Sequence, residues 1–140
     1  MATLVDLHSN SLSGGIPIPS QNIVFIDYSD NLFNSSLSES IGRNLTYAYF
    51  LSVSNNLLTG TIPDIICNAT CLKVLDLSNN HLTGRIPRCL IEFGNDLGVL
   101  NLANNGLTGQ IEGTFPTTCS LNTLDLYYVS CNFGLKLPLW

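Results

Sequence analysis

Hydrophobic residues recur along this chain in a fixed order, and this order divides the chain into six similar units. Each unit opens with two apolar residues that flank a single residue, as in "LDL" at 75–77. Residues two positions apart point to the same side of a β-strand, so each unit predicts a short strand with one buried face. The two apolar columns hold Val5, Ile26, Leu51, Leu75, Leu100 and Leu124, and then Leu7, Tyr28, Val53, Leu77, Leu102 and Leu126.

The rest of each unit predicts a corner and a return path. A third apolar column follows the strand, and in most units a Thr-Gly or Ser-Gly pair then precedes an apolar residue and often a proline. Glycine allows backbone angles that other residues avoid and proline fixes φ, so together they turn the chain. The return path has room for a turn or two of helix, and we expect its inward column to be Ile41, Ile66, Leu90 and Phe115.

An asparagine follows the predicted strand in five units. A buried amide is costly unless it is hydrogen-bonded, so these side chains predict a ladder that bonds to the backbone of the adjacent bends. The alternative is that they are ordinary turn residues at the surface, where asparagine is common. The ladder residues are Asn10, Asn31, Asn56, Asn80 and Asn105.

No single unit can bury its own apolar face, whereas stacked units bury one another's, as in a solenoid. The signature L-x-x-L-x-L-x-x-N-x-L resembles that of leucine-rich repeat proteins, and "LTGTIP" and "LTGRIP" resemble the plant extracellular subtype. The resemblance implies an α/β solenoid, a right-handed coil with a parallel concave β-sheet and a second short sheet. It implies one domain over 1–140 without clear caps, with units near 2–22, 23–47, 48–71, 72–96, 97–120 and a degenerate 121–140.

The stretch "IPRCLIEFGNDLGVLNLANNGLTG" resembles the later repeats of plant receptor-like proteins of the disease-resistance type. This resemblance implies an ectodomain on the extracellular face of the plasma membrane that binds a protein or peptide ligand, with a co-receptor kinase as a further partner. The chain departs from the pattern at "NSSLS" (34–38), and neither end resembles a polar cap. The chain starts within one repeat and stops within another, so we expect part of a longer receptor or a truncated product. No secretory signal or membrane-spanning run is visible in the sequence.

Composition and charge exclude several other classes of protein. The chain has 140 residues, of which 11% are charged, and its net charge is -5 with only five Lys and Arg. Nucleic-acid binding needs clustered cations, so a nucleic-acid partner is not expected. The two histidines, His8 and His81, fall in different units without the spacing of metal ligands. Since no nucleophile motif or phosphate loop is present either, we expect no catalytic site, metal or cofactor.

The candidate ligand-binding residues alternate with the inward columns and therefore point out over the predicted concave face. Several are carboxylates, and this acidic stripe favours an extended cationic peptide. The alternative is that "LDLS" is simply the default spelling of the repeat. Aromatic residues at 25, 49, 50, 127 and 128 add contact surface nearby. The candidates are Asp6, His8, Asp27, Ser29, Ser52, Ser54, Asp76, Ser78, Asn101, Asp125 and Tyr127.

Sequons and cysteines indicate an oxidising, secretory environment. Asn34, Asn44 and Asn68 begin N-x-Ser/Thr sequons, and all three avoid the predicted concave strands. Among five cysteines, Cys67 and Cys89 fall on the return paths of adjacent coils, so a disulfide between them is plausible. The rival is Cys67 with Cys71, one helical turn away. The odd number leaves at least one thiol unpaired within the chain, and Cys119 and Cys131 fit equally well as simple buried thiols.

Three functions remain open from the sequence alone. The first is a non-enzymatic recognition module of a plant cell-surface receptor-like protein in defence or developmental signalling. The second is a secreted inhibitor of a cell-wall-degrading enzyme, a role known in similar plant repeat proteins. The third is a truncated product without independent function, whose open apolar ends would favour aggregation.

Overall fold

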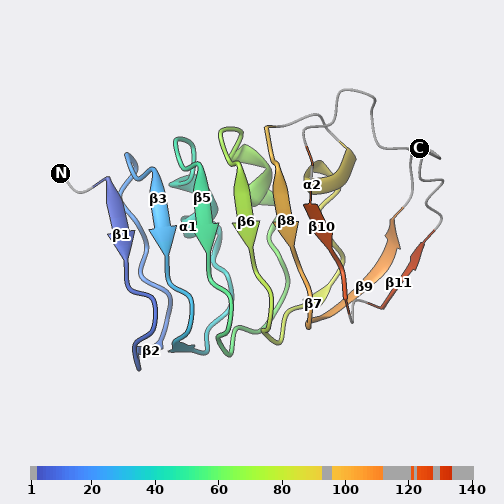
Figure 1. Ribbon diagram of the computed structural model, residues 1–140, viewed down its shortest axis with the longest axis horizontal. Helices are drawn as coiled ribbons and strands as arrows, with labels where there is room; N and C mark the ends of the chain where they lie inside the picture. The colour runs from blue at the N-terminus through green and yellow to red at the C-terminus, as the bar shows by residue number, and fades with distance from the viewer. Residues whose placement is uncertain (1–2, 93–95, 112–120, 122, 128–129, 134–140) are drawn as a thin grey trace.

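The computed structural model shows a row of stacked coils, each of which runs down a strand, around a corner and back along a return path (Figure 1). The structure describes residues 3–92, 96–111, 121, 123–127 and 130–133. Successive coils lie side by side along the long axis in the order of the sequence (Figure 1). This arrangement confirms the α/β solenoid predicted from the repeated pattern.

One six-stranded parallel sheet runs the length of the molecule. It takes one strand from each predicted unit, in sequence order: β1 (Leu4–Asp6), β3 (Phe25–Asp27), β5 (Phe50–Ser52), β6 (Val74–Asp76), β8 (Val99–Asn101) and β10 (Thr123–Asp125). The register matches the first apolar column, because Leu51 pairs with Leu75 and Leu75 pairs with Leu100. The sequence alignment of the units therefore predicted the register of the strands.

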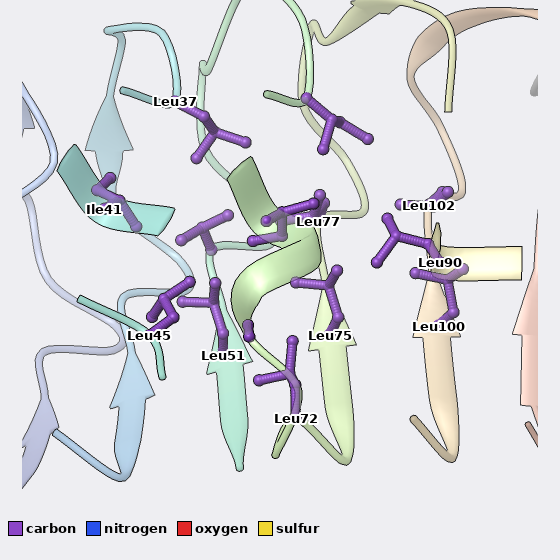
Figure 2. Packing of buried hydrophobic residues seen from close by; sticks show 14 of the residues in the cluster. Leu37, Ile41, Leu45, Leu51, Leu72, Leu75, Leu77, Leu90, Leu100 and Leu102 are labelled. Carbon is purple, nitrogen blue, oxygen red and sulfur yellow. The ribbon is translucent and has the colours of Figure 1, made fainter. Parts of the chain in front are cut away.

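The core lies between this sheet and the return paths. Leu75, Leu77 and Leu100 have no measurable solvent exposure, and side chains from the return side pack against them (Figure 2). Burial weakens at the N-terminal coil, where Val5 and Leu7 are only half-buried. Each coil is covered by its neighbours on both sides, and the first described coil has a neighbour on one side only.

A second set of short parallel strands forms after the corner. It comprises the pair β2 (Ser13–Gly14) and β4 (Leu32–Phe33), and the three strands β7 (Thr83–Gly84), β9 (Gly106–Ile111) and β11 (Ser130–Phe133). Only isolated bridges join residues between the two groups, from Ser36 to Thr59 and from Thr61 to Thr83. The non-standard "NSSLS" corner (34–38) thus coincides with the interruption of this second layer.

Three short helical segments occupy the return paths and lie behind the main sheet in Figure 1. They are α1 (Glu39–Arg43), the 3-10 helix η1 (Asp64–Asn68) and α2 (Cys89–Glu92). Ile41, Ile66 and Leu90 are buried there, as predicted, while Phe115 lies outside the described residues. Among the described residues, none of the helices is long and apolar enough to cross a lipid bilayer.

A disulfide joins η1 to α2 on adjacent coils. It links Cys67 to Cys89, whose Cα atoms lie 5.7 Å apart. Cys71, the rival partner, is a free and exposed thiol. Cys119 and the side chain of Cys131 lie outside the described residues.

The asparagine side chains connect each coil to the one before it. Asn80 Nδ2 donates to the carbonyls of Val53, Leu77 and Ser78 at 3.0–3.1 Å, and its Oδ1 accepts the Leu58 N–H at 3.0 Å. Asn31, Asn56 and Asn105 repeat this pattern, whereas the exposed Asn10 bonds only within its own coil. Each amide thereby satisfies backbone groups at both ends of a buried bend.

The residue before each ladder asparagine adopts a left-handed backbone conformation. The φ angle is 53–55° at Ser9, Asp30, Asn55, Asn79 and Asn104. Asparagine and aspartate tolerate this region better than other non-glycine residues, which accounts for the repeated "NN" pair. We did not predict this column from the sequence.

Gly42 should not tolerate alanine, although it lies within helix α1. A Cβ atom there would collide with Ile65 Cγ2 and lie 3.2 Å from the Ile65 carbonyl carbon, because α1 packs closely against η1. Alanine normally stabilises a helix interior relative to glycine by about 0.5–1 kcal/mol, but overpacking costs roughly 1–3 kcal/mol. We therefore expect Gly42→Ala to lower the free energy of unfolding, measured by denaturant titration.

Gly15→Ala provides the matched control. Nothing lies within 4 Å of a Cβ atom at Gly15, and its φ is not positive. This substitution should leave stability unchanged or raise it by up to about 1 kcal/mol. Equal or greater stability of Gly42→Ala would show that α1 and η1 do not pack this closely.

Candidate functional site

The solvent-facing side of the main sheet, here called the open face, carries three rows of side chains that cross the strands. These residues alternate with the buried column and therefore point to the opposite side. The apolar row holds Leu4, Phe25, Phe50, Val74 and Val99, and it ends at Thr123 on the sixth strand. The polar row is Asp6, Asp27, Ser52, Asp76, Asn101 and Asp125, and the third row is His8, Ser29, Ser54, Ser78, Ala103 and Tyr127.

Side chains of the polar row accept hydrogen bonds from the backbone two residues later. Asp76 Oδ1 accepts the Ser78 N–H at 2.9 Å and the Ser78 hydroxyl at 2.6 Å. Asp27 makes the same two bonds with Ser29, and Asp125 accepts the Tyr127 N–H. These bonds satisfy a backbone donor at the end of each strand and fix the direction of the carboxylate. The repeated Asp-x-Ser pattern therefore has a structural role in addition to any role in binding.

The serines predicted as ligand contacts lie on the open face but are buried. Ser52, Ser54 and Ser78 are 3–7% exposed, and Ser29 is 8% exposed. The hydroxyls of Ser29 and Ser78 are occupied by the neighbouring carboxylates, and those of Ser52 and Ser54 lie 3.2 Å apart. The groups that reach solvent are instead the carboxylates, Asn101, His8 and Tyr127. Contact of a ligand with any of these residues stays a prediction.

The apolar row widens into an aromatic cluster on β3 and β5. The rings of Phe25 and Phe50 stack at 4.4 Å with an interplanar angle of 10°, and Tyr49 packs against Phe25 at 6.1 Å. Tyr49 is 46% exposed, and Tyr127, which follows β10 at the other end of the sheet, is also exposed. Tyr128 lies outside the described residues. Exposed aromatic side chains on a rigid sheet are typical of protein contact surfaces.

The first two strands bring two carboxylates and an imidazole together. Asp6 pairs with Asp27 across β1 and β3, and His8 Nδ1 lies 2.5 Å from Asp6 Oδ1. This hydrogen bond raises the pKa of His8, and the same bond lowers the pKa of Asp6. One ligand atom from each of Asp6, His8 and Asp27 lies within 4.8 Å of the others.

The sequence predicts no metal-ligand spacing for either histidine, yet the structure brings His8 close to Asp6 and Asp27. That prediction considered distances along the sequence, whereas the parallel register brings Asp27 beside Asp6 from a different unit. The aligned columns already contained the necessary signal, because Asp6 and Asp27 occupy the same column in consecutive units.

Lysine and arginine neutralise acidic groups away from the open face. Arg43 pairs with Glu39, Lys73 with Asp96, and Arg85 with Asp64. None of these carboxylates belongs to the polar row. The open face therefore carries negative charge that these three cations do not balance.

The three sequons lie outside the open face and differ in exposure. Asn34 and Asn68 are exposed at the corner of the second coil and at the end of η1. Asn44 is half-buried, and its Nδ2 donates to the Pro19 carbonyl at 2.7 Å. A glycan at Asn44 would have to share this nitrogen with that hydrogen bond, whereas Asn34 and Asn68 have no such constraint among their described contacts.

Comparison with known proteins supports the same architecture. The family model for the leucine-rich repeat matches residues 49–69 and 71–93. Among curated proteins, none matches the chain.

Several solved plant receptor structures superpose on the chain. The ectodomain of the Arabidopsis receptor kinase HAESA, in complex with an IDA peptide hormone, is 32% identical, with a TM-score of 0.75, and 91% of this chain and 22% of that chain are covered. The ectodomain of GASSHO1/SCHENGEN3 from Arabidopsis thaliana, in complex with CASPARIAN STRIP INTEGRITY FACTOR 2, is 28% identical with a TM-score of 0.71. The match covers 78% of this chain and 13% of that chain. The BIR3–SERK2 complex from Arabidopsis thaliana contains a chain that is 35% identical with a TM-score of 0.61, and the match covers 73% of this chain and 54% of that chain.

The chain thus spans only part of the length of these receptors. The repeat signature, the stacked coils and the structural matches agree with one another. The chain thus carries leucine-rich repeats, and its coils match those of plant receptor ectodomains.

Proposed function

We propose that this chain is a non-enzymatic recognition module of a plant cell-surface receptor-like protein, and that it binds a protein or peptide along the open face. The observation that carries this proposal is the presence of two unlike rows side by side on six paired strands. One row is apolar and includes the Phe25–Phe50 stack, and the other contains four carboxylates. Such a surface offers both desolvation and charge to a single ligand.

The charge of the open face favours a cationic ligand. Asp27, Asp76 and Asp125 are oriented by backbone hydrogen bonds, so little side-chain entropy remains to be lost when they meet a cation. The described lysine and arginine ion pairs lie elsewhere. A basic side chain can thus approach these carboxylates without displacing those ion pairs.

The geometry of the rows favours an extended chain that crosses the strands. Neighbouring strands lie about 4.8 Å apart, and an extended peptide advances about 6.6 Å for every two residues. Side chains on one edge of such a peptide would therefore meet the apolar row repeatedly, while those on the other edge meet the polar row. The ligand we propose is an extended segment that carries apolar and basic side chains in alternation.

The neighbouring structures support binding of this kind. The HAESA structure is a complex with a peptide hormone, and the GASSHO1/SCHENGEN3 structure is a complex with CASPARIAN STRIP INTEGRITY FACTOR 2. Another HAESA structure contains the co-receptor SERK1 as well as the peptide IDA. By analogy, we propose that the parent protein of this chain signals in defence or development at the extracellular face of the plasma membrane, together with a co-receptor kinase.

A pair of synthetic peptides tests the proposal. Both are about twelve residues long, enough to cross the described strands. One alternates leucine with arginine, and the other alternates leucine with glutamate. The basic peptide should bind, and its affinity should fall with added salt because charge contributes to the contact. Fluorescence anisotropy of labelled peptides measures both affinities.

Matched substitutions place the contact on the molecule. Phe50→Ala and Asp27→Asn should each lower the affinity for the basic peptide about fivefold or more, which corresponds to about 1 kcal/mol of binding free energy. Leu57→Ala and Asp64→Asn remove the same kinds of side chain from exposed positions outside the open face and should leave affinity unchanged. Equal binding of both peptides, or equal effects of the two sets of substitutions, would refute the proposal.

A further inference from the structure

Two departures from the repeat coincide at the first two strands of the main sheet. Asp6 and Asp27 are neighbouring carboxylates in the polar row, whereas each later aspartate is separated from the next by Ser52 or Asn101. The third row holds serine or alanine on the next four strands, and only the first strand has an imidazole, that of His8. The repeat itself therefore does not account for this group of side chains.

The three side chains have atoms that are not used by the local turns. Asp6 Oδ1 accepts the His8 N–H and contacts His8 Nδ1, while Asp27 Oδ1 accepts two hydrogen bonds from Ser29. The second oxygen of each carboxylate and the Nε2 atom of His8 remain as further ligand atoms. One ligand atom from each residue already lies within 4.8 Å of the other two.

We propose that Asp6, His8 and Asp27 bind a divalent transition-metal ion of the zinc class, with water as the fourth ligand. An imidazole nitrogen with two carboxylate oxygens is a donor set that suits zinc better than calcium or magnesium, which prefer sites made of oxygen alone. Two carboxylates and a neutral imidazole also balance the charge of a divalent cation.

The site needs only small movements to close around the ion. Metal–ligand bonds of about 2.0–2.2 Å place tetrahedral ligand atoms roughly 3.4 Å apart. The side chains of His8 and Asp6 are 53% and 41% exposed, so rotation about their side-chain bonds can bring the ligand atoms to this spacing. The Asp27 carboxylate is held by Ser29 and supplies the fixed point of the site. Binding exchanges the Asp6–His8 hydrogen bond for bonds to the metal.

A metal titration of the whole chain tests this inference. Because Cys71 is an exposed thiol and thiolates bind zinc, all variants carry Cys71→Ser. After treatment with a chelator and dialysis, zinc chloride is titrated near neutral pH by calorimetry, and cobalt chloride by visible absorption. We expect one ion per chain, and a cobalt spectrum without the near-ultraviolet charge-transfer band that thiolate ligands produce.

Substitutions then identify the ligands. His8→Ala and Asp27→Asn should each weaken zinc binding at least about tenfold, since each removes one of three protein ligands. His81→Ala and Asp96→Asn are matched in type but lie outside the site, and they should bind zinc as the parent does. Circular dichroism of each variant checks that the coil is intact.

Three results would overturn the inference. They are no binding by the parent chain, undiminished binding by His8→Ala, and a thiolate charge-transfer band that shows coordination by cysteine. The metal site does not depend on the proposed peptide function, because these measurements use no peptide. Failure of the peptide experiment therefore leaves this inference standing, and the reverse holds as well.

Discussion

Asn80→Ala should lower the free energy of unfolding by roughly 2–5 kcal/mol, because it leaves buried backbone groups without partners. The Asn80 side chain is the acceptor for the Leu58 N–H and a donor to the Val53 carbonyl on the preceding coil. Asn80 is only 5% exposed, so water does not replace these bonds readily. Chemical denaturation followed by circular dichroism measures the loss.

Asn55→Gly is the matched control for the ladder. Asn55 is exposed and has a φ of 53°, which glycine adopts without strain. Removing this side chain should change stability by less than about 1 kcal/mol. A loss for Asn80→Ala as small as that of the control would show that the ladder amides are not structural.

Leu75→Ala should be at least as damaging, with a loss of roughly 2–5 kcal/mol from lost burial and the cavity left behind. Leu75 is fully buried on β6, between Leu51 on β5 and Leu100 on β8 (Figure 2). Thermal and denaturant unfolding give the difference.

Leu57→Ala makes the same chemical change at an exposed position. Leu57 is 42% exposed on the outer side of the bend, so its removal should cost less than about 1 kcal/mol. If both leucine variants lost equal stability, the core would not lie between the sheet and the return paths.

The repeated pattern predicts the coil well because every column appears several times. Leu75 alone would be one apolar residue among many, but its column also holds Ile26, Leu51 and Leu100, and the sheet pairs these residues directly. The same redundancy pointed to the asparagine ladder. A repeat thus allows the chain to be aligned to itself, so that each column is observed several times.

Features that depend on close local geometry were not predictable in this way. The burial of Ser54 and Ser78 follows from the tight bend after each strand. The sequence shows this bend only as a run of polar residues, which does not reveal that the serines are buried. The approach of α1 to η1 at Gly42 depends on how two irregular return paths pack. The grouping of His8 with Asp27 required reading columns across units for chemistry as well as for hydrophobicity.

The buried ladder amides reach no further than the coil before them, so folding cooperativity in this molecule passes between nearest neighbours. A defect in a middle coil would divide the cooperative unit into two, whereas the same defect in a terminal coil would only shorten it. A ligand that lies across several strands would link coils that do not otherwise touch. Occupancy and global unfolding would then be thermodynamically coupled, and affinity would report on the integrity of the entire array.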